Sequence, residues 1–460
     1  ESSRIAMVGK LVASVCSFAL LALAPGYYLY NFSNPSGGSR QWSQHALRRL
    51  GTTAVASAQG LTASFAFDLQ QQFEVLPEGG ERGWLGADAA ASIVIGGGRT
   101  GRRALWLYAD TLLTEYHSGN QSRQWDGLQM PRSSIAMVEC DSVSCGGRPE
   151  YIWREDASRV GSKIGEAAFF EPPLAELRRG VALWPVAGVA ARDGKSALLV
   201  AIRVNVSDYS VLGTTLIALP DVASVEDPRK WDYKLYDVGA ENVTWFTAIG
   251  FADGRTDSLY LWGHIGSDKH TTHLARATYS ELMRGRWDTV EYWSRPHGDE
   301  QSQWSRHADA TSLAPIGPAS WEGTITWSEE LGLWYSFFTD DDDITDPSIY
   351  MYVAEDMTGP WSRLKAYDIP GPFGTDGKSW SCYAAKAHPE LAGAPIAGHA
   401  NADLVLTYLC NERGGSKKLF QPMGMFWPSR SYWPTFVRVS VPRDLRQKLP
   451  HSSMVASGRR

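Results

Sequence analysis

The sequence has no excess of basic residues: 44 Lys and Arg stand against 50 Asp and Glu, and the formal net charge is −6. A surface that binds nucleic-acid phosphates needs a basic excess, so we expect no nucleic-acid partner. Long helical periodicity is scarce, and neither zinc-ligand spacing nor a P-loop occurs. The glycines at 96–98 lie between two strand-like runs, which indicates a hairpin turn and not a phosphate-binding loop.

The longest apolar stretch lies at the N-terminus, where residues 5–30 contain one charged residue, Lys10. A membrane-spanning helix needs roughly 20 apolar residues. Arg4 and Lys10 precede the apolar run, which predicts a cytosolic N-terminus and a body that faces the secretory lumen or the cell exterior. A cleaved signal peptide, and hence a secreted protein, is the alternative, although Pro25 is unfavourable for cleavage. We therefore expect residues 1–30 to be a signal anchor or a signal peptide.

Cysteine is scarce, with 5 in 460 residues, and its placement fits an oxidising compartment. One cysteine lies in the apolar segment, and four remain in the body. Cys140 and Cys145 are close enough in sequence to close a loop, whereas Cys382 and Cys410 lie in successive strand-like runs that a disulfide could join. Free buried thiols are the alternative. Four glycosylation sequons point to the same compartment: Asn31, Asn120, Asn205 and Asn242.

Short β-branched and aromatic runs of four to eight residues, separated by Gly, Asp and Asn, dominate from residue 81 onward. Such runs predict an all-β fold, with short helical pieces only near residues 173–179 and 279–283. Residues 31–80 predict a stalk and the strand that leads into the domain. Residues 441–460 are polar and basic, which predicts a disordered tail.

A coarse repeat organises residues 81–440. In each copy, an acidic or aromatic residue precedes an apolar strand, a turn and a second strand. Five inner strands are expected to start near Asp88, Trp184, Trp245, Glu322 and Tyr383. Five such units predict a five-bladed β-propeller, in which each blade is a four-stranded sheet. A β-sandwich is the alternative, but this length of strands is large for one sandwich.

The segment most informative about chemistry is the expected hairpin at residues 84–111. Its first strand starts after Asp88 and its second ends before Asp110, so both carboxylates should lie at the same rim. Two carboxylates at a channel mouth suit glycoside hydrolysis, in which one protonates the leaving oxygen and the other activates water or attacks the anomeric carbon. Carboxyl groups roughly 5–10 Å apart in an open site would support this role. Enclosure by arginine partners would argue against it, and capping of a turn is the structural alternative for each residue.

The hairpin, in which Trp84-Leu-Gly-Ala-Asp88 and Leu107-Tyr-Ala-Asp110-Thr111 carry the likeness, resembles that of the bacterial endo-D-arabinanase family of five-bladed propellers. That family has Gly-Gly-Asp-Gly and Phe-Gly-Asp-Thr there, whereas this chain has Ala at 87, 89 and 109. Further likeness extends over residues 80–440, at 132–137, 183–185, 244–248, 272–276, 287–293, 358–362, 385–391 and 404–411. The resemblance implies hydrolysis of a furanoside-containing or related polysaccharide in a funnel on the propeller axis, with Asp88 and Asp110 as the acid/base pair.

Other residues are expected to face the same funnel. Glu322 would be a third carboxylate, with a blade-edge position as the alternative. Trp184 and Trp245 lie where rings could stack on sugars, whereas Trp293 and Trp361 fall on outer strands and suit packing. His388 could bind substrate, hold a water or a metal, or be a satisfied core histidine.

No cofactor is expected. The acidic run at residues 340–343, with Asp346, offers oxygen ligands for Ca²⁺, but its spacing is not that of an EF-hand, and a solvated loop is favoured. Two functions remain open: a glycoside hydrolase, or a non-catalytic propeller that binds glycans or proteins as an adhesion or receptor head. The Gly to Ala departures favour the second. The sequence predicts no oligomeric state, sugar or stereochemical outcome.

Overall fold

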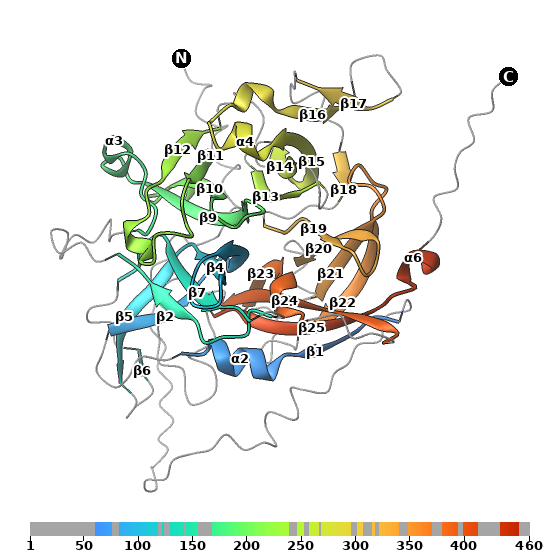
Figure 1. Cartoon of the computed structure of the whole chain (residues 1–460), viewed down its shortest axis with the longest axis horizontal. Helices are drawn as coiled ribbons and strands as arrows, with labels where there is room; N and C mark the ends of the chain where they lie inside the picture. Colours follow the sequence, from blue (N-terminus) through green and yellow to red (C-terminus); the bar gives the residue numbers. More distant parts are fainter. Residues whose placement is uncertain are drawn as a thin grey trace, which may run out of the picture.

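The computed structural model describes residues 60–75, 82–117, 122–123, 129–141, 144–154, 168–238, 246–252, 257–265, 268–295, 301–306, 315–317, 322–339, 348–369, 380–393, 399–412 and 433–449. These residues form six antiparallel sheets, five of which are arranged around a common axis, as Figure 1 shows. The all-β, five-bladed propeller predicted from the repeat is therefore confirmed.

Blades 2, 3 and 4 are built from strands that follow one another in sequence, whereas blade 1 omits β5 (Thr111–His117) and β6 (Ser122–Arg123) and blade 5 includes the first strand of the chain. Blade 1 holds β3 (Ala91–Gly96), β4 (Arg102–Tyr108), β7 (Ser134–Glu139) and β8 (Glu150–Ile152), and blade 2 holds β9 (Val181–Ala190), β10 (Ala197–Asn205), β11 (Ser210–Leu219) and β12 (Lys234–Asp237). Blade 3 holds β13 (Phe246–Phe251), β14 (Ser258–Ile265), β15 (Asp268–Thr278), β16 (Glu291–Ser294), β17 (Gln303–Ser305) and β18 (Pro315–Gly317). Blade 4 holds β19 (Thr326–Ser328), β20 (Leu333–Thr339), β21 (Ser348–Ala354) and β22 (Ser362–Asp368).

Blade 5 is closed by both ends of the domain: β23 (Trp380–Ala387), β24 (Asn401–Glu412) and β25 (Thr435–Pro442) are joined by β1 (Thr62–Phe65). Because β1 pairs along its whole length with β25, the first strand of the chain completes the last blade and locks the ring. The propeller thus begins at β1 and not at residue 81.

The predicted tail also needs correction at its start. β25 runs to Pro442, and α6 (Leu445–Lys448) follows it. Leu445 is fully buried in the same core cluster as Leu61, which explains why this polar stretch is held against the domain. The polar composition of this stretch gave no sign of its one buried leucine, and the described chain continues beyond residue 441, to Leu449.

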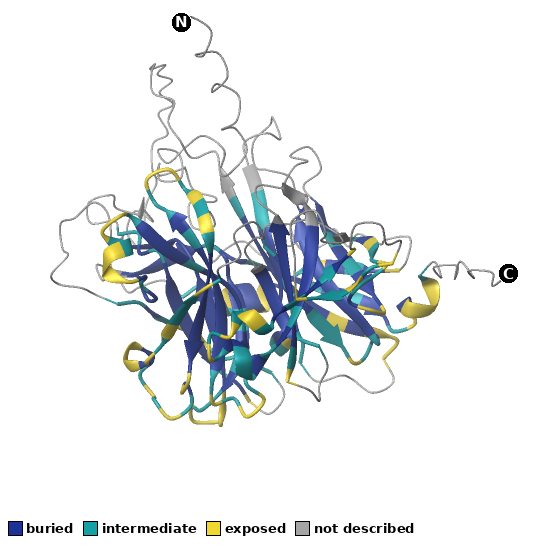
Figure 2. Cartoon of the chain, turned by 90° about the horizontal axis from the view of Figure 1, so that it is seen from above, coloured by how far each residue is buried: buried dark blue, intermediate teal, exposed yellow. Residues whose placement is uncertain are grey.

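The remaining elements connect or flank the blades. A small side sheet of β2 (Arg82–Ala87), β5 (Thr111–His117) and β6 (Ser122–Arg123) lies beside blade 1. The short helices are α2 (Phe67–Phe73), α3 (Leu174–Leu177), α4 (Tyr279–Leu282), η2 (Pro228–Lys230), η3 (Trp287–Thr289) and η4 (Pro389–Leu391). α3 and α4 fall where short helices were expected. In Figure 2 the blade strands are mostly buried, and exposed residues gather at the turns.

Both predicted disulfides are present. Cys140 is bonded to Cys145, and Cys382 is bonded to Cys410. The second bond joins directly opposed residues of β23 and β24, as the two strand-like runs had suggested. Disulfides persist in oxidising compartments, so the pairing fits a body outside the cytosol.

The N-terminal apolar segment at 1–30 lies outside the described residues, as do Asn31, Asn120 and Asn242. Within the described ranges, no helix is long and apolar enough to cross a membrane. Asn205 is described and ends β10, where its side-chain oxygen accepts hydrogen bonds from the backbone N–H and hydroxyl of Ser207.

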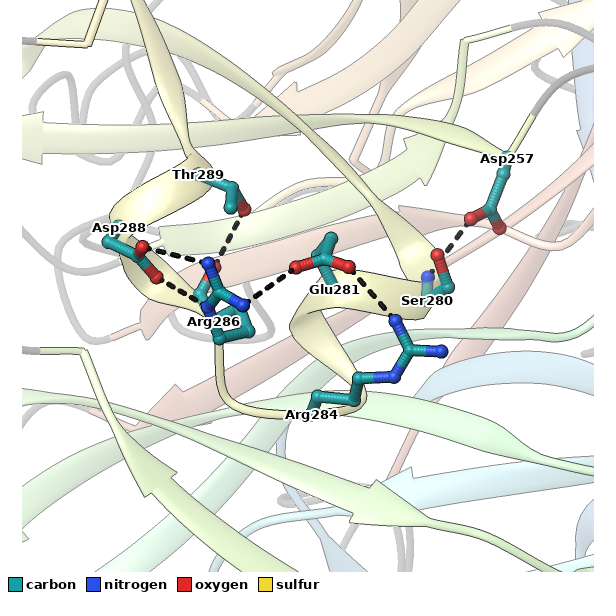
Figure 3. A network of polar contacts seen from close by, with 7 residues as sticks. All are labelled: Asp257, Ser280, Glu281, Arg284, Arg286, Asp288 and Thr289. Carbon is teal, nitrogen blue, oxygen red and sulfur yellow. Dashed lines mark hydrogen bonds and ion pairs between the residues drawn. The ribbon is translucent and has the colours of Figure 1, made fainter.

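The ion pairs around α4 and η3 are largely exposed to solvent. Figure 3 shows Arg286 donating to both carboxylate oxygens of Asp288, at 2.9 and 3.1 Å, while Arg284 pairs with Glu281 in the same turn. Arg286 and Asp288 are more than half exposed. Exposed pairs of this kind contribute little to stability and are screened by salt, so we assign this network no functional role.

Candidate active site at the propeller axis

Asp88 and Asp110 lie side by side, as the hairpin geometry predicted. β3 pairs with β4 so that Ala91 opposes Leu107, which brings the residues before and after them together. The backbone N–H of Asp88 donates to the carbonyl of Asp110 at 3.1 Å, and the N–H of Ala109 donates to the carbonyl of Asp88 at 3.0 Å. The two residues are therefore fixed relative to one another by the main chain, 22 positions apart.

The turn after Asp88 has a backbone that normally requires glycine. Ala89 and Ala90 both have positive φ, at 72° and 49°, and both are buried. Left-handed backbone costs a non-glycine residue about 1–2 kcal/mol, and such strain concentrates at functional sites. Ala89 therefore adopts a backbone conformation that favours glycine, although the residue there is alanine.

The carboxylate of Asp110 is enclosed. Arg132 donates one nitrogen to both of its oxygens at 3.0 Å, and the indole N–H of Trp184 donates to Oδ1 at 2.9 Å. The Asp110 side chain is 4% exposed. Burial raises the pKa of Asp110, and the charge and hydrogen bond of Arg132 oppose that increase. This arginine contact argues against direct attack by Asp110 and leaves it the role of a fixed neighbour to Asp88.

Asp88 is the carboxyl group whose environment most favours its protonated form. Its pKa lies well above the usual 3.8, because burial disfavours the charge and the neighbouring carboxylates of Asp110 and Glu322 repel it. Its Oδ1 is enclosed and has no hydrogen-bond partner in the described part of the chain, whereas Tyr383 donates to Oδ2 at 3.5 Å. The residue as a whole remains partly exposed. A carboxyl group that is held protonated is suited to donate a proton.

Glu322 approaches Asp88 from the other side of the ring. It precedes β19 in blade 4, which is not a neighbour of blade 1 in a five-bladed ring, and its charge still raises the pKa of Asp88. Glu322 forms an ion pair with Lys386 at 3.1 Å, and its side chain is 18% exposed. It is thus more accessible than Asp110. The structure brings together all three predicted carboxylates, which we call the carboxyl cluster: Asp88, Asp110 and Glu322.

His388 lies behind this cluster and is fully buried. Its Nδ1 is 2.6 Å from the hydroxyl of Ser92, its Nε2 is 2.7 Å from the hydroxyl of Thr407, and its ring stacks on Trp106. Both nitrogens are engaged inside the protein, so the structure favours the core alternative over contact with substrate or metal. Within the described ranges, no group of three His, Cys, Asp or Glu residues could hold a metal ion.

Trp184 is half-buried and lies beside Tyr209, with ring centroids 6.1 Å apart. Tyr209 occupies the turn between β10 and β11 with a left-handed φ of 57°, and Arg132 lies 5.8 Å from its ring centroid. These two rings form an aromatic edge next to Asp110. Trp245 lies outside the described residues, as does the acidic run at 340–343 with Asp346.

Four residues of the site were not predicted as site residues: Arg132, Tyr209, Tyr383 and Lys386. Arg132 lies in a family-like segment, and Tyr383 marks the expected start of an inner strand, but neither was expected to contact the carboxyl cluster. Lys386 lies in the family-like segment at 385–391, but its burial could not be predicted, because a buried lysine resembles a solvated one in sequence. The turn that holds Tyr209 is indicated by the preceding sequence, Asn205-Val-Ser-Asp208, since Asn and Asp favour turns.

The raised pKa of Asp88 predicts a pH-dependent stability. A carboxyl group with a raised folded-state pKa stabilises the fold below its unfolded value, 3.8, and this contribution is lost as pH rises through the folded pKa. Wild type should therefore lose stability relative to Asp88→Asn as pH rises above 3.8 towards the raised pKa of the folded state. Denaturant unfolding of both proteins across this range tests the prediction, and parallel curves would contradict it.

Comparison with solved structures places the fold among known propellers. A protein of Bacteroides ovatus, described as a candidate hydrolase, is 15% identical, with a TM-score of 0.63 over 91% of this chain and 100% of its own. At this identity the match supports the fold alone. The α-L-arabinofuranosidase of Podospora anserina, solved with cellotriose, is 10% identical with a TM-score of 0.39, over 80% of this chain and 96% of its own. A family 62 arabinofuranosidase of Coprinopsis cinerea is 8% identical with a TM-score of 0.38, over 79% of this chain and 95% of its own. The last two are too distant to carry an argument.

Comparison by sequence gives the family. A search of curated proteins found no match. A family model described as a domain of unknown function, DUF5005, matches residues 72–441, which span the propeller except β1 and make up most of the chain. The chain therefore belongs to the DUF5005 family.

Proposed function

We propose that this protein is a glycoside hydrolase that acts on a furanoside-containing or related polysaccharide at the carboxyl cluster. The observation that carries the proposal is the environment of Asp88, a half-buried residue whose carboxyl pKa is raised by burial and by two neighbouring carboxylates. Glycoside hydrolysis needs one protonated and one ionised carboxyl group around the scissile bond. The furanoside class comes from the resemblance of the hairpin to endo-D-arabinanases.

The roles follow from accessibility. Asp88 donates its proton to the glycosidic oxygen as the bond to the anomeric carbon breaks. Glu322 is more exposed than Asp110, so it either takes a proton from the attacking water or attacks the anomeric carbon itself. Asp110, held by Arg132 and Trp184, raises the pKa of Asp88. Trp184 and Tyr209 offer rings against which a sugar can stack.

A second function has its own support. Asp110 and Glu322 are each paired with a cation, Arg132 and Lys386, so two charges of the cluster are already compensated. Such pairing is what a non-catalytic site needs to keep buried carboxylates stable. A glycan- or protein-binding head is therefore the alternative. In either case we propose that the body faces the secretory lumen or the exterior, held by residues 1–30 or secreted, with glycans at the four sequons.

The experiment that separates the two functions uses the full-length chain on a panel of furanoside and pyranoside polysaccharides. New reducing ends and glycan binding are measured on the same samples. The hydrolase proposal expects new reducing ends from furanoside-containing substrates over hours. Saturable binding on a glycan array with no new reducing ends after prolonged incubation would instead support the binding head.

A further inference from the structure

Lys386 is a fully buried lysine in an otherwise apolar inner strand. Burial of an ammonium group is costly unless it is paired and hydrogen-bonded. Its Nζ lies 3.1 Å from Glu322 Oε2 and donates to the carbonyl oxygen of Val186 at 2.8 Å. Lys386 belongs to blade 5, Glu322 to blade 4 and Val186 to blade 2. Since blades 5 and 2 are not neighbours, the lysine side chain spans the axis.

Two irregularities in the inner strands make this contact possible. In β23, Tyr383 pairs with Leu409 and Lys386 with Thr407, so β23 carries one extra residue there, and Ala384 has a φ of 54°. This bulge places Tyr383 and Lys386 on one face, although three positions apart they would otherwise face opposite sides. Tyr383 contacts Asp88 from that face, and Lys386 contacts Glu322.

The second irregularity lies in β9, opposite the first. Ala187 pairs with Val200 and Pro185 with Ala201, which leaves Val186 without a partner in the ladder between these strands. A bulge frees backbone groups that need a new partner, and the carbonyl of Val186 finds it in Lys386. The bulge in β23 therefore directs the Lys386 side chain, and the bulge in β9 supplies the carbonyl oxygen that accepts its hydrogen bond.

We propose that Lys386 is a positioning residue that holds the carboxylate of Glu322 in place at the propeller axis, through the charge contact at 3.1 Å and its own anchorage on the carbonyl of Val186. This inference rests on the proposed function and extends it, because it explains how the second carboxyl group of the cluster is held in position beside Asp88. The cluster then has an ordered pattern of charge. Lys386 compensates Glu322 on one side, Arg132 compensates Asp110 on the other, and Asp88 lies between the two carboxylates.

The charged and titratable groups around this pattern come from several elements: Lys386 and Tyr383 from β23, Asp88 from the turn before β3, Asp110 from the turn after β4, and Arg132 from the segment before β7. A nearby cation favours the ionised form of a carboxyl group by about 1–3 pH units. Removal of the Lys386 charge should therefore make Glu322 harder to ionise by a shift of this size.

The test uses Lys386→Gln, whose amide can still donate to the carbonyl of Val186 but carries no charge. In the pH dependence of kcat/KM, the acidic limb should move upward by about 1–3 pH units, because this limb reports ionisation of the base. Lys386→Arg keeps the charge and should leave the limb near its wild-type position. A uniform loss of activity with an unmoved limb would show a merely structural role and overturn the inference.

A readout without catalysis separates this inference from the proposed function. Infrared titration of the full-length protein with isotope-labelled glutamate isolates Glu322 by subtraction of the Glu322→Gln spectrum. The protonation midpoint of Glu322 should rise by about 1–3 pH units in Lys386→Gln. A rise without activity on any glycan would defeat only the hydrolase proposal. An unchanged midpoint would overturn the positioning role. If Lys386→Gln does not fold, recovery of folding in Lys386→Gln/Glu322→Gln would support the pairing, and failure to recover would contradict it.

Discussion

Asp88→Asn should lower kcat/KM on the cleaved polysaccharide by about 10²–10⁴-fold, the usual loss when a positioned general acid is removed. Asparagine keeps the size of the side chain but has no proton to donate to the glycosidic oxygen. The backbone bonds between residues 88 and 110 do not involve the carboxyl group, so the fold should remain intact. Initial rates of reducing-end release, with a circular dichroism spectrum as the check of folding, measure the effect.

The matched control is Asp257→Asn, in the residue just before β14 of blade 3. Asp257 accepts a hydrogen bond from the backbone N–H of Ser280 (Figure 3). An asparagine oxygen can accept the same bond, so activity should not change. Equal activity of Asp88→Asn and Asp257→Asn would show that Asp88 takes no part in the reaction. Loss of glycan binding in Asp88→Asn, in place of lost cleavage, would favour the binding head.

Arg132→Met should destabilise the protein by about 3–5 kcal/mol, the usual cost of leaving one member of a buried ion pair without its partner. Asp110 is nearly fully buried, and Arg132 is its cation partner at 3.0 Å. The double variant Arg132→Met/Asp110→Asn removes both charges and should recover most of the lost stability. Denaturant unfolding of the two single variants and the double variant measures this coupling.

The exposed pair of Arg286 and Asp288 is the internal comparison for this cycle. Because both side chains are solvated, Arg286→Met should change the unfolding free energy far less than Arg132→Met does. Strictly additive losses in the Arg132 and Asp110 cycle would show that the two residues are not coupled. The assignment of Asp110 as a fixed, arginine-held neighbour of Asp88 would then be wrong.

The parts of the fold that were predictable are those with local signals. The apolar runs on either side of residues 96–98 predicted the hairpin, and the hairpin in turn predicted that Asp88 and Asp110 lie close together. The positions expected for the five inner strands lie within a few residues of where β3, β9, β13, β19 and β23 begin. The cysteine pairings followed from short spacing in one case and from adjacent strands in the other.

The parts that were not predictable depend on contacts between distant segments. β1 is only four residues long, and nothing in its sequence indicates that it pairs with β25. The bulge at Ala384 carries no glycine to mark it, so the direction of Lys386 was hidden. Arg132 and Asp110 are separated by 22 positions, and their pairing changed the expected catalytic partner of Asp88 from Asp110 to Glu322.

The most direct test of hydrolysis at the carboxyl cluster is incubation of a furanoside-containing polysaccharide with the full-length protein in water labelled with heavy oxygen. Hydrolysis places one labelled oxygen at each new reducing end, which mass spectrometry of the released oligosaccharides detects. We expect labelled products with wild type and with Asp257→Asn, and almost none with Asp88→Asn or Glu322→Gln. Glycan bound without labelled products, or labelled products at equal rates from all four proteins, would contradict the account.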